Sequence, residues 1–457
     1  MNTLYPMPAE PLTPTAYQRA LGLPRLLAGI RAHGALSLED HVAIHGPLPA
    51  SGGRGRRRAR ERASMLVEQI ERSGLLGHGG AAFPTATKMR AVAGARGRAI
   101  VVVNAAEGEP ASRKDRTLLE TLPHLVLDGG ILAAEAVGAD EVIVCACESA
   151  DIGIESVTRA IEERAAAGSE RSPSLHVATV PANYVAGQES ALVSYLNGGL
   201  AKPTFTPPMP FEQGVRRRPT LINNAETVAH VALIARHGAS WFRQLGPPSQ
   251  PGSMLVTLSG PLAHPGVYEI EHGSSLSSLI QAAGGTTTRV RGALVGGYAG
   301  AWVDGDLLSG VALSNEHLVA HGASLGAGVV LLLSEHACPA AETGRLARWL
   351  ASQSTRQCGP CVHGLDALAM TVQEIAGGIA QAGAGQRIER LASLTARRGA
   401  CGHPDGAVKL ILSALETFEA EFADHAQHGP CDSCARPPEM PMPHRAVSQD
   451  ASRGARR

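Results

Sequence analysis

Aromatic residues are scarce in this chain of 457 residues, and neither sign of charge is in excess. Phe, Trp and Tyr make up 3% of the sequence. This argues against binding of single-stranded nucleic acid, because such proteins stack bases on aromatic side chains. Acidic and basic residues balance at 41 each, so no net charge attracts a nucleic acid or an anionic membrane. We therefore expect no nucleic-acid partner.

Long apolar runs are also missing. A membrane-spanning helix needs about twenty consecutive apolar residues. The longest candidate, Ala323–Leu333, is short and interrupted by glycine, and we expect it to form a buried strand. The first residues lack a basic stretch followed by an apolar one, so we expect no secretory signal and a cytoplasmic location, free or peripheral to a membrane complex. In that compartment the eight cysteines are expected to be thiols or metal ligands.

Apolar, β-branched runs alternate with helical patterns over residues 63–245. The sequence predicts strands at Ala99–Val103, Val142–Cys147 and His176–Val180, and helices at Ala63–Ser73 and Leu125–Val137. Such alternation is typical of parallel strands joined by crossover helices, so the expected fold class is α/β, with a Rossmann-like three-layer domain. Cys145 and Cys147 lie two apart on one strand and are expected to be buried core thiols.

Breaks in composition divide the rest of the chain. Residues 1–62 are expected to be an N-terminal extension that ends in an exposed basic linker, Ser51–Arg60. A Pro- and Gly-rich break at Gly246–Gly252 precedes a small domain of a β-hairpin and a helix over residues 250–335. The apolar periodicity of residues 338–435 predicts a helical bundle. Residues 436–457 are rich in Pro, Arg and Ser and are expected to be disordered.

A glycine-rich segment, Gly77-His-Gly-Gly-Ala-Ala-Phe-Pro-Thr-Ala-Thr-Lys88, opens the α/β region. Closely spaced glycines let the backbone approach a ligand and direct its N–H groups at a phosphate or a flat ring. Lys88 could then neutralise a phosphate. The spacing matches neither a dinucleotide-binding fingerprint nor a Walker loop. Taken alone, the segment fits a surface loop as well as a binding site.

Three polar motifs are expected at one edge of the sheet. Asn104-Ala-Ala-Glu-Gly-Glu-Pro110 directly follows the first strand, and α/β sheets bind ligands at the carboxyl ends of their strands. Lys114-Asp-Arg116 comes next, as a helix-start ion cluster or as support for a site. Tyr184–Ser190 and Asn223–Thr227 both precede helical patterns, whose N-termini favour anions. A solvated turn or a simple helix cap is the alternative for each motif.

Taken in order, these motifs resemble those of the NADH-binding flavoprotein subunit of complex I and its relatives in NAD-linked hydrogenases and formate dehydrogenases. The family patterns GxGGAGFPTGxKW, NxDExEPGxxKDR, YxxGEExAL and NNVET correspond to Gly77–Met89, Asn104–Arg116, Tyr184–Leu192 and Asn223–Thr227. The segment from Ser259 resembles the family's ubiquitin-like SLBB domain, a β-grasp fold. The resemblance covers roughly residues 65–425 and implies FMN and NADH as cofactor and substrate.

The resemblance also implies roles for individual residues. It assigns FMN binding to Gly77, Gly79, Gly80, Lys88, Asn104, Glu107, Tyr184, Gly187, Gln188, Asn223, Asn224 and Thr227. Phe83, Glu109 and Glu189 would face the nicotinamide nucleotide, with the two carboxylates as the catalytic pair. In this family the protein orients the partners while the flavin carries the hydride chemistry.

Several positions depart from the family pattern. Ala106 and Gln188 replace two acidic residues, and a carboxylate near the flavin repels its reduced, anionic form, so their loss predicts a raised flavin potential. Ala91 and Met209 stand where the family has aromatic residues. Thr204 and Thr206 replace basic residues of the PRLKPPFP segment. These changes affect the residues expected to bind the nicotinamide nucleotide. The electron donor could therefore be NADH, NADPH or a protein.

The helical region contains Gln353-Ser-Thr-Arg-Gln-Cys-Gly-Pro-Cys361-Val-His-Gly364, similar to the family's ESCGxCxPCREG. Cys358, Cys361 and the distant Cys401 match three cluster ligands, and Thr355 stands at the first. The sequence allows a 4Fe-4S cluster, a 3Fe-4S cluster or zinc. The candidates for a fourth ligand are His363, His403, Ser354, Cys431 and Cys434, and Cys338 is expected to be a single buried thiol.

Three functions remain open on the sequence. The first oxidises NAD(P)H at FMN and passes electrons through the cluster to a ferredoxin-like or other redox subunit. The second runs the same chemistry in reverse and reduces NAD from a ferredoxin. The third is an electron relay or scaffold that uses a ferredoxin-type donor and has lost NADH oxidation.

Overall fold

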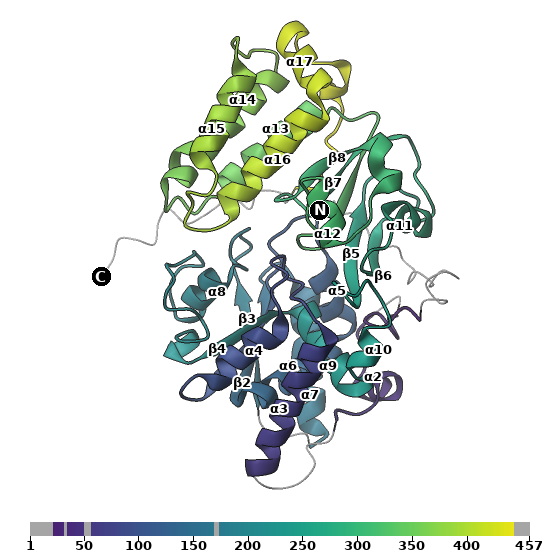
Figure 1. The fold of residues 1–457 in the computed structure, drawn as a ribbon, viewed down its shortest axis with the longest axis vertical. Helices are drawn as coiled ribbons and strands as arrows, with labels where there is room; N and C mark the ends of the chain where they lie inside the picture. The colour runs from purple at the N-terminus through teal and green to yellow at the C-terminus, as the bar shows by residue number, and fades with distance from the viewer. Residues whose placement is uncertain (1–21, 32–33, 50–55, 169–172, 443–457) are drawn as a thin grey trace.

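The computed structural model describes residues 22–31, 34–49, 56–168 and 173–442. They form an α/β domain, a smaller mixed sheet and a helical bundle, in this order along the chain (Figure 1). The bundle and the smaller sheet both lie over one end of the α/β domain (Figure 1). None of the helices in the described ranges combines the length and the apolar character that a membrane crossing requires.

The α/β domain is built on four parallel strands in the order β3-β2-β1-β4. The strands are β1 (Ala99–Ala105), β2 (Ala139–Cys147), β3 (Ser174–Val180) and β4 (Thr220–Asn224). β1 is central and almost wholly buried, which explains its continuous run of β-branched residues. Because the strands are parallel, the motifs that follow β1, β3 and β4 meet at one edge of the sheet.

Helices cover the two faces of this sheet unequally. One face packs against α6 (Pro123–Val137) and α9 (Ala225–His237), with α3 (Arg56–Ser73), α4 (Thr85–Gly94), α5 (Lys114–Thr121) and α7 (Asp151–Ala166) around them. The other face, which includes Ile100, Val102 and Cys145, meets α8 (Glu189–Leu196) and the turn at Val215. Two short helices, α2 (Leu38–His45) and α10 (Ala239–Phe242), complete the domain.

The second part is a five-stranded mixed sheet in the order β6-β5-β9-β7-β8. Its elements are β5 (Ser253–Ser259), β6 (Gly266–Glu271), α11 (Leu276–Ala282), β7 (Val290–Val295), β8 (Ala301–Asp304), α12 (Asn315–Ala320) and β9 (Val329–Ser334). β5 pairs antiparallel with β6 and parallel with β9, as in a β-grasp fold.

The third part is a bundle of five helices. They are α13 (Pro339–Ser352), α14 (Leu365–Ala376), α15 (Ala384–Thr395), α16 (His403–Thr417) and α17 (Glu419–His428). A π-helical turn at Pro360–Gly364 leads into α14 and carries Cys361. The predicted fold class, an α/β domain followed by a β-grasp domain and a helical region, is confirmed.

Four expectations need correction. Helix α3 begins at Arg56, so the predicted basic linker is helical over its last five residues, from Arg56 to Arg60. Only Val329–Ser334 of the predicted strand Ala323–Leu333 is a strand, because Gly326 and Gly328 adopt positive φ angles and form a loop. Residues 439–442 are packed rather than disordered, since Met440 is buried and its neighbours are partly buried. Cys338 is buried as expected, but other cysteines lie beside it. Residues 443–457 of the expected tail lie outside the described residues.

Candidate functional site

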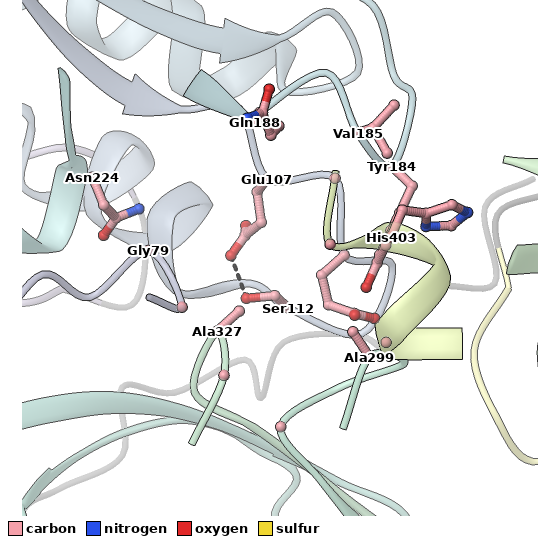
Figure 2. A pocket seen from close by; sticks show the side chains of 18 of the residues that line it. Gly79, Glu107, Ser112, Tyr184, Val185, Gln188, Asn224, Ala299, Ala327 and His403 are labelled. Atoms are coloured by element: carbon pink, nitrogen blue, oxygen red, sulfur yellow. Dashed lines mark hydrogen bonds between the residues drawn. The ribbon is translucent and has the colours of Figure 1, made fainter. Parts of the chain in front are cut away.

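A cavity of about 600 Å³ lies where the three parts of the chain meet (Figure 2). Nine of the residues predicted to contact the flavin or the nucleotide line it: Gly79, Gly80, Asn104, Glu107, Glu109, Tyr184, Gly187, Gln188 and Asn224. Seven more residues of the α/β domain also line it: His78, Ala106, Gly108, Ser112, Lys114, Asp115 and Val185. The rest of the wall comes from loops of the mixed sheet (Gly296, Ala299, Ser324, Gly326, Ala327) and from the bundle (Cys401, Gly402, His403, Asp405, Gly406, Lys409). Such a volume is typical of a site for a cofactor or small molecule.

Asparagine side chains join the loops at the carboxyl ends of the strands. Asn104 and Asn224 lie opposite each other in the register of β1 and β4. The Asn104 amide donates to the carbonyl of Gly187 at 2.7 Å, which fixes the loop after β3 to β1. The Asn224 amide donates to the carbonyl of Asn104 at 3.2 Å, and its oxygen caps α9 by accepting from the Glu226 N–H.

Two glycines allow these loops to approach closely. A Cβ on Gly187 would lie 2.4 Å from the carbonyl oxygen of Ala106, and one on Gly108 would lie 2.5 Å from that of Tyr184. Neither separation is possible for a real side chain, so only glycine permits this arrangement of backbone around the cavity. The family resemblance includes Gly187, whereas Gly108 was not singled out.

Lys114 is the centre of a buried ionic network beneath the cavity. Its ammonium lies 2.9 Å from Asp115 Oδ1, from Glu226 Oε2 and from Asn224 Oδ1. Burial acts to lower the pKa of Lys114, but the charges of Asp115 and Glu226 outweigh it and raise that pKa, so the lysine stays charged. The sequence left Lys114 as part of an ion cluster or as support for a site; the structure shows the ion cluster and places Lys114 at the cavity.

Two carboxylates after β1 face the cavity with different partners. Glu107 accepts from the Ser112 hydroxyl, the contact drawn in Figure 2, and burial raises its pKa, as does the charge of Asp115. Glu109 accepts from the backbone N–H of Tyr298 at 2.9 Å and is hydrogen bonded to the Tyr184 hydroxyl. Burial raises the pKa of Glu109 to about 7, although these hydrogen bonds oppose the shift. Glu109 can therefore hold or release a proton near neutral pH.

Six predicted residues do not line the cavity: Gly77, Phe83, Lys88, Glu189, Asn223 and Thr227. Lys88 instead forms an ion pair with Glu189, and it also donates to the carbonyl of Ile222 at 3.1 Å. The Thr227 hydroxyl accepts from the backbone N–H of His78 at 2.9 Å and so supports the glycine loop from behind. Phe83 is 48% exposed, which leaves its ring available at the protein surface.

Sequence reasoning missed the contribution of the mixed sheet and the bundle. Tyr184 packs edge-on against Trp349 at 5.3 Å and lies 5.4 Å from His403, so it links the α/β domain to the bundle. His403 Nε2 lies 2.9 Å from the carbonyl of Leu350, and its buried Nδ1 has no partner among the described residues. His78, although inside the first motif, was also missed, and it lines the cavity.

A second cavity of about 400 Å³ lies beside α8 and the segment 204–210. Thr204 and Thr206, which replace basic residues of the family pattern, line it together with Phe205. The Phe205 ring is 90% exposed and was not singled out from the sequence. Met209 is also exposed. This surface offers one flat aromatic face, and Arg217 is the one basic side chain among the described residues that line it.

Three predicted metal ligands lie close together at the end of the bundle that faces the main cavity. The Cys358 and Cys361 thiols are hydrogen bonded to each other, and Cys401 is close enough for its charge to affect Cys361. Burial acts to raise the pKa of Cys358, but hydrogen bonds from the backbone of Ala400 and Cys361 lower it overall, which favours the thiolate that a metal requires. Cys401 also lines the main cavity.

Three cysteines outside this motif are excluded as fourth ligands by their position. Cys338 caps the N-terminus of α13, whereas Cys358 follows its C-terminus. The 14 residues of this helix span about 21 Å. Cys431 and Cys434 lie beside Cys338, at the opposite end of the bundle from Cys358. The remaining candidates are Ser354, which hydrogen bonds to the Cys361 carbonyl, the exposed His363 and the buried His403.

Three protein-family models match this chain. Residues 70–233 match the Nuo51 FMN-binding domain, residues 255–297 the SLBB domain, and residues 341–425 the NADH-ubiquinone oxidoreductase-F iron-sulfur binding region. One of the F subunits of NADH-quinone oxidoreductase in Rhizobium meliloti is 32% identical over 379 residues, which cover 80% of this chain and 90% of the relative. The corresponding F subunit of Streptomyces coelicolor is 30% identical, and the match covers 79% of this chain and 82% of the relative.

Solved structures are also similar to this chain. The crystal structure of an NAD+-reducing NiFe hydrogenase in the air-oxidized state superimposes with a TM-score of 0.75 and 31% sequence identity. The match covers 82% of this chain but only 64% of the hydrogenase chain, so this chain spans less than two thirds of that protein.

Proposed function

Because the chain belongs to the family of NADH-quinone oxidoreductase F subunits, we propose that it oxidises NAD(P)H at FMN and passes the electrons to an iron-sulfur cluster. One observation carries the proposal: the glycine-bearing loops of the α/β domain and Cys401 of the cluster motif line the same cavity. When bound, FMN takes up two electrons as a hydride and releases them singly. A cavity that places the flavin next to a cluster ligand allows the single electrons to pass from the flavin to the cluster.

The residues around the cavity fit FMN. Gly108 and Gly187 keep the backbone of two loops free of side chains. Asn104 and Asn224 hold these loops together. We assign FMN binding to the cavity-lining residues of the four motifs. Gly77, Lys88, Asn223 and Thr227 then act from behind as supports of the loops.

Glu109 and Glu189 differ in what they can do for a nicotinamide. Glu109 faces the cavity and, with its pKa of about 7, exchanges a proton near neutral pH. Glu189 is paired with Lys88, so we assign it to holding the edge of the site rather than to proton transfer. Phe83 is exposed and offers a ring for stacking.

The cluster site has three cysteine ligands and an open fourth position. Cys358, Cys361 and Cys401 are close to one another, and Thr355 is buried at the position of the missing cysteine. A three-iron cluster, or a four-iron cluster with one iron held by another ligand, fits this set. We propose that the electrons leave here for a ferredoxin-like or other redox subunit, in the cytoplasm.

A second candidate function is an electron relay that takes electrons from a ferredoxin-type protein. The second cavity favours it, because Thr204 and Thr206 replace two basic residues of the family pattern. Of the described residues, Arg217 is then the one basic residue that lines this cavity, which leaves less positive charge for a nucleotide phosphate. The replacement of two carboxylates by Ala106 and Gln188, both in the main cavity, predicts a raised flavin potential. A higher potential favours electron transfer to the flavin from either donor, so it does not separate the two functions.

An anaerobic titration separates the two candidates. The purified protein is titrated with NADH, and separately with NADPH, while its flavin absorbance is recorded. Bleaching by a stoichiometric amount of either nucleotide is expected for the first function. A flavin that reduced ferredoxin bleaches, and neither nucleotide does, would establish the relay, with dithionite as the control that the flavin can be reduced. A colourless protein after flavin addition would contradict both.

A further inference from the structure

Four side chains at the far end of the bundle converge on one point, away from the cluster motif. They are Cys338, His425, Cys431 and Cys434, and we refer to them as the Cys3His group. Their ligand atoms all lie within 4.8 Å of one another. They come from the N-terminus of α13, from α17 and from the turn that follows α17. Only the fold brings Cys338 to the other three.

The distances within the Cys3His group fit a single bound ion. Cys434 Sγ lies 3.4 Å from Cys338 Sγ and 3.8 Å from Cys431 Sγ. His425 Nε2 lies 3.5 Å from Cys338 Sγ and 4.0 Å from Cys434 Sγ. In a tetrahedral zinc site with Zn–S bonds of about 2.3 Å, the sulfur atoms are about 3.8 Å apart. A 4Fe-4S cluster puts each cysteine on a different iron, and a 2Fe-2S cluster puts only two protein ligands on each iron. Neither cluster brings four ligand atoms as close together as a single ion does.

The orientation of His425 supports metal binding. Its Nδ1 lies 3.0 Å from the carbonyl oxygen of Ala376, which can only accept a hydrogen bond, so Nδ1 carries the proton. Nε2 is then unprotonated and presents its lone pair to the thiols. A backbone carbonyl that orients a histidine in this way is the usual second contact of a metal-bound imidazole.

We propose that the Cys3His group binds one zinc ion in a closed, structural site distinct from the iron-sulfur centre. Three thiolates and one imidazole form a complete tetrahedral ligand set, which leaves no position for a substrate. A disulfide is the competing use of these thiols. It would bring two sulfur atoms to about 2.05 Å and would leave the third thiol and the imidazole without a role.

The position of the group indicates what the ion stabilises. The segment after Cys434 runs back across the mixed sheet, where Glu439 accepts from the Ser334 N–H at 3.0 Å and its own N–H donates to Glu342 at 2.7 Å. The Tyr298 hydroxyl donates to the carbonyl of Pro441. Tyr298 also donates to Glu109 through its backbone. The ion would therefore hold the segment that supports one wall of the flavin cavity.

The test begins with the wild-type full chain, purified anaerobically from medium that contains zinc and iron. Elemental analysis should find one zinc per chain in addition to iron. Zinc-edge X-ray absorption should show three sulfur ligands at about 2.3 Å and one nitrogen at about 2.0 Å. Absence of zinc, or zinc bound by oxygen and nitrogen alone, would overturn the proposal, as would a disulfide among these cysteines under anaerobic conditions.

Paired variants then separate the two metal sites. Cys434→Ser and His425→Gln should lower zinc content at least several-fold and leave iron and its EPR signal unchanged. Cys358→Ser should do the reverse. Cys147→Ser, in a buried thiol outside both sites, should change neither metal. If Cys434→Ser loses both metals, the wild-type X-ray absorption spectrum decides the assignment: three sulfur ligands and one nitrogen support it, and any other set refutes it. Loss of iron alone in Cys434→Ser would refute the assignment.

Discussion

Glu109, just after β1, accepts a hydrogen bond of 2.9 Å from the backbone N–H of Tyr298 in the loop between β7 and β8. This contact joins the α/β domain to the mixed sheet at the wall of the cavity. Because the acceptor is a buried carboxylate, protonation of Glu109 changes the strength of this hydrogen bond between the two domains. The pKa of Glu109, raised by burial to about 7, places this change near neutral pH.

The first prediction concerns the pH dependence of stability. Burial raises the pKa of Glu109 from 4.5 to about 7, so between these values the folded protein holds a proton that the unfolded chain releases. Its contribution to the free energy of unfolding is therefore complete below the lower value and falls as pH rises to about 7. In Glu109→Gln this fall is absent.

The measurement compares denaturant midpoints of the two proteins from about pH 5 to about pH 8. The stability of Glu109→Gln relative to wild type should rise across this range. Glu155→Gln, at an exposed position on α7, serves as the control and should run parallel to wild type. A Glu109→Gln curve that also runs parallel would show that Glu109 is ionised throughout.

The buried network leads to the second prediction. In Lys114→Met, Asp115 and Glu226 would lose the one lysine or arginine that the described residues place within salt-bridge distance of them. His78 lies 3.8 Å from Glu226, but burial lowers its pKa to about 3, so it is neutral. Removing one partner of a buried ion pair costs about 3–5 kcal/mol of unfolding free energy. We also expect a loss of flavin, because Lys114 positions Asn224. Lys202→Met, at an exposed site, should change the unfolding free energy by less than about 0.5 kcal/mol. Equal effects of the two variants would refute the role of the network.

The sequence was sufficient to predict that the motifs at the strand ends meet, because parallel strands place their carboxyl ends at one edge of the sheet. Asn104 and Asn224 are 120 residues apart, yet the register of β1 and β4 places them side by side. The opposite wall could not be predicted in this way. Ala299 and Gly326 are small residues in loops of another domain, and no local pattern connects them to the first four motifs.

Long-range convergence also explains the error at Cys338. In the sequence it stands alone, 87 residues before His425, so a single buried thiol was the reasonable expectation. The antiparallel packing of α13 and α14 and the return of α17 bring it next to Cys434. The same packing moves Cys431 and Cys434 away from Cys358, which spacing alone could not show.

The third prediction tests the electrostatics of the cavity. Gln188 caps α8, with its side-chain oxygen accepting from the Ala191 N–H at 3.0 Å, and a glutamate can make the same contact. Gln188→Glu should therefore fold normally and place a negative charge at the cavity wall. Repulsion of the reduced flavin should lower its midpoint potential by tens of millivolts, on the order of the Coulomb energy at this range.

Spectroelectrochemical titration of the flavin gives this potential directly. Gln281→Glu introduces the same charge on the exposed face of α11 and should leave the potential unchanged. An unchanged potential in Gln188→Glu would mean that the flavin lies elsewhere, whereas a rise in potential would contradict the electrostatic argument.

The fourth prediction tests the close approach of the two loops. Gly187→Ala would place a Cβ 2.4 Å from the Ala106 carbonyl oxygen, so one loop must move. We expect the bound flavin per chain to fall at least several-fold, measured by absorbance after gel filtration. Gly94→Ala makes the same change where no atom lies within 4 Å, and it should retain full flavin content. Flavin retained in both variants would exclude this loop from the binding site.

The last prediction concerns the open position of the cluster. Thr355 is buried and stands where the family pattern has its first cysteine ligand. Thr355→Cys should complete a four-cysteine set with Cys358, Cys361 and Cys401, because only a thiolate at that position is missing. We expect iron content to rise towards four per cluster and the EPR signal to become that of a reduced 4Fe-4S cluster. Thr371→Cys, at a buried threonine on α14, is the matched control and should leave iron content and EPR unchanged. If Thr355→Cys also leaves both unchanged, the wild-type cluster already has its fourth ligand, and Ser354, His363 and His403 become the residues to replace next.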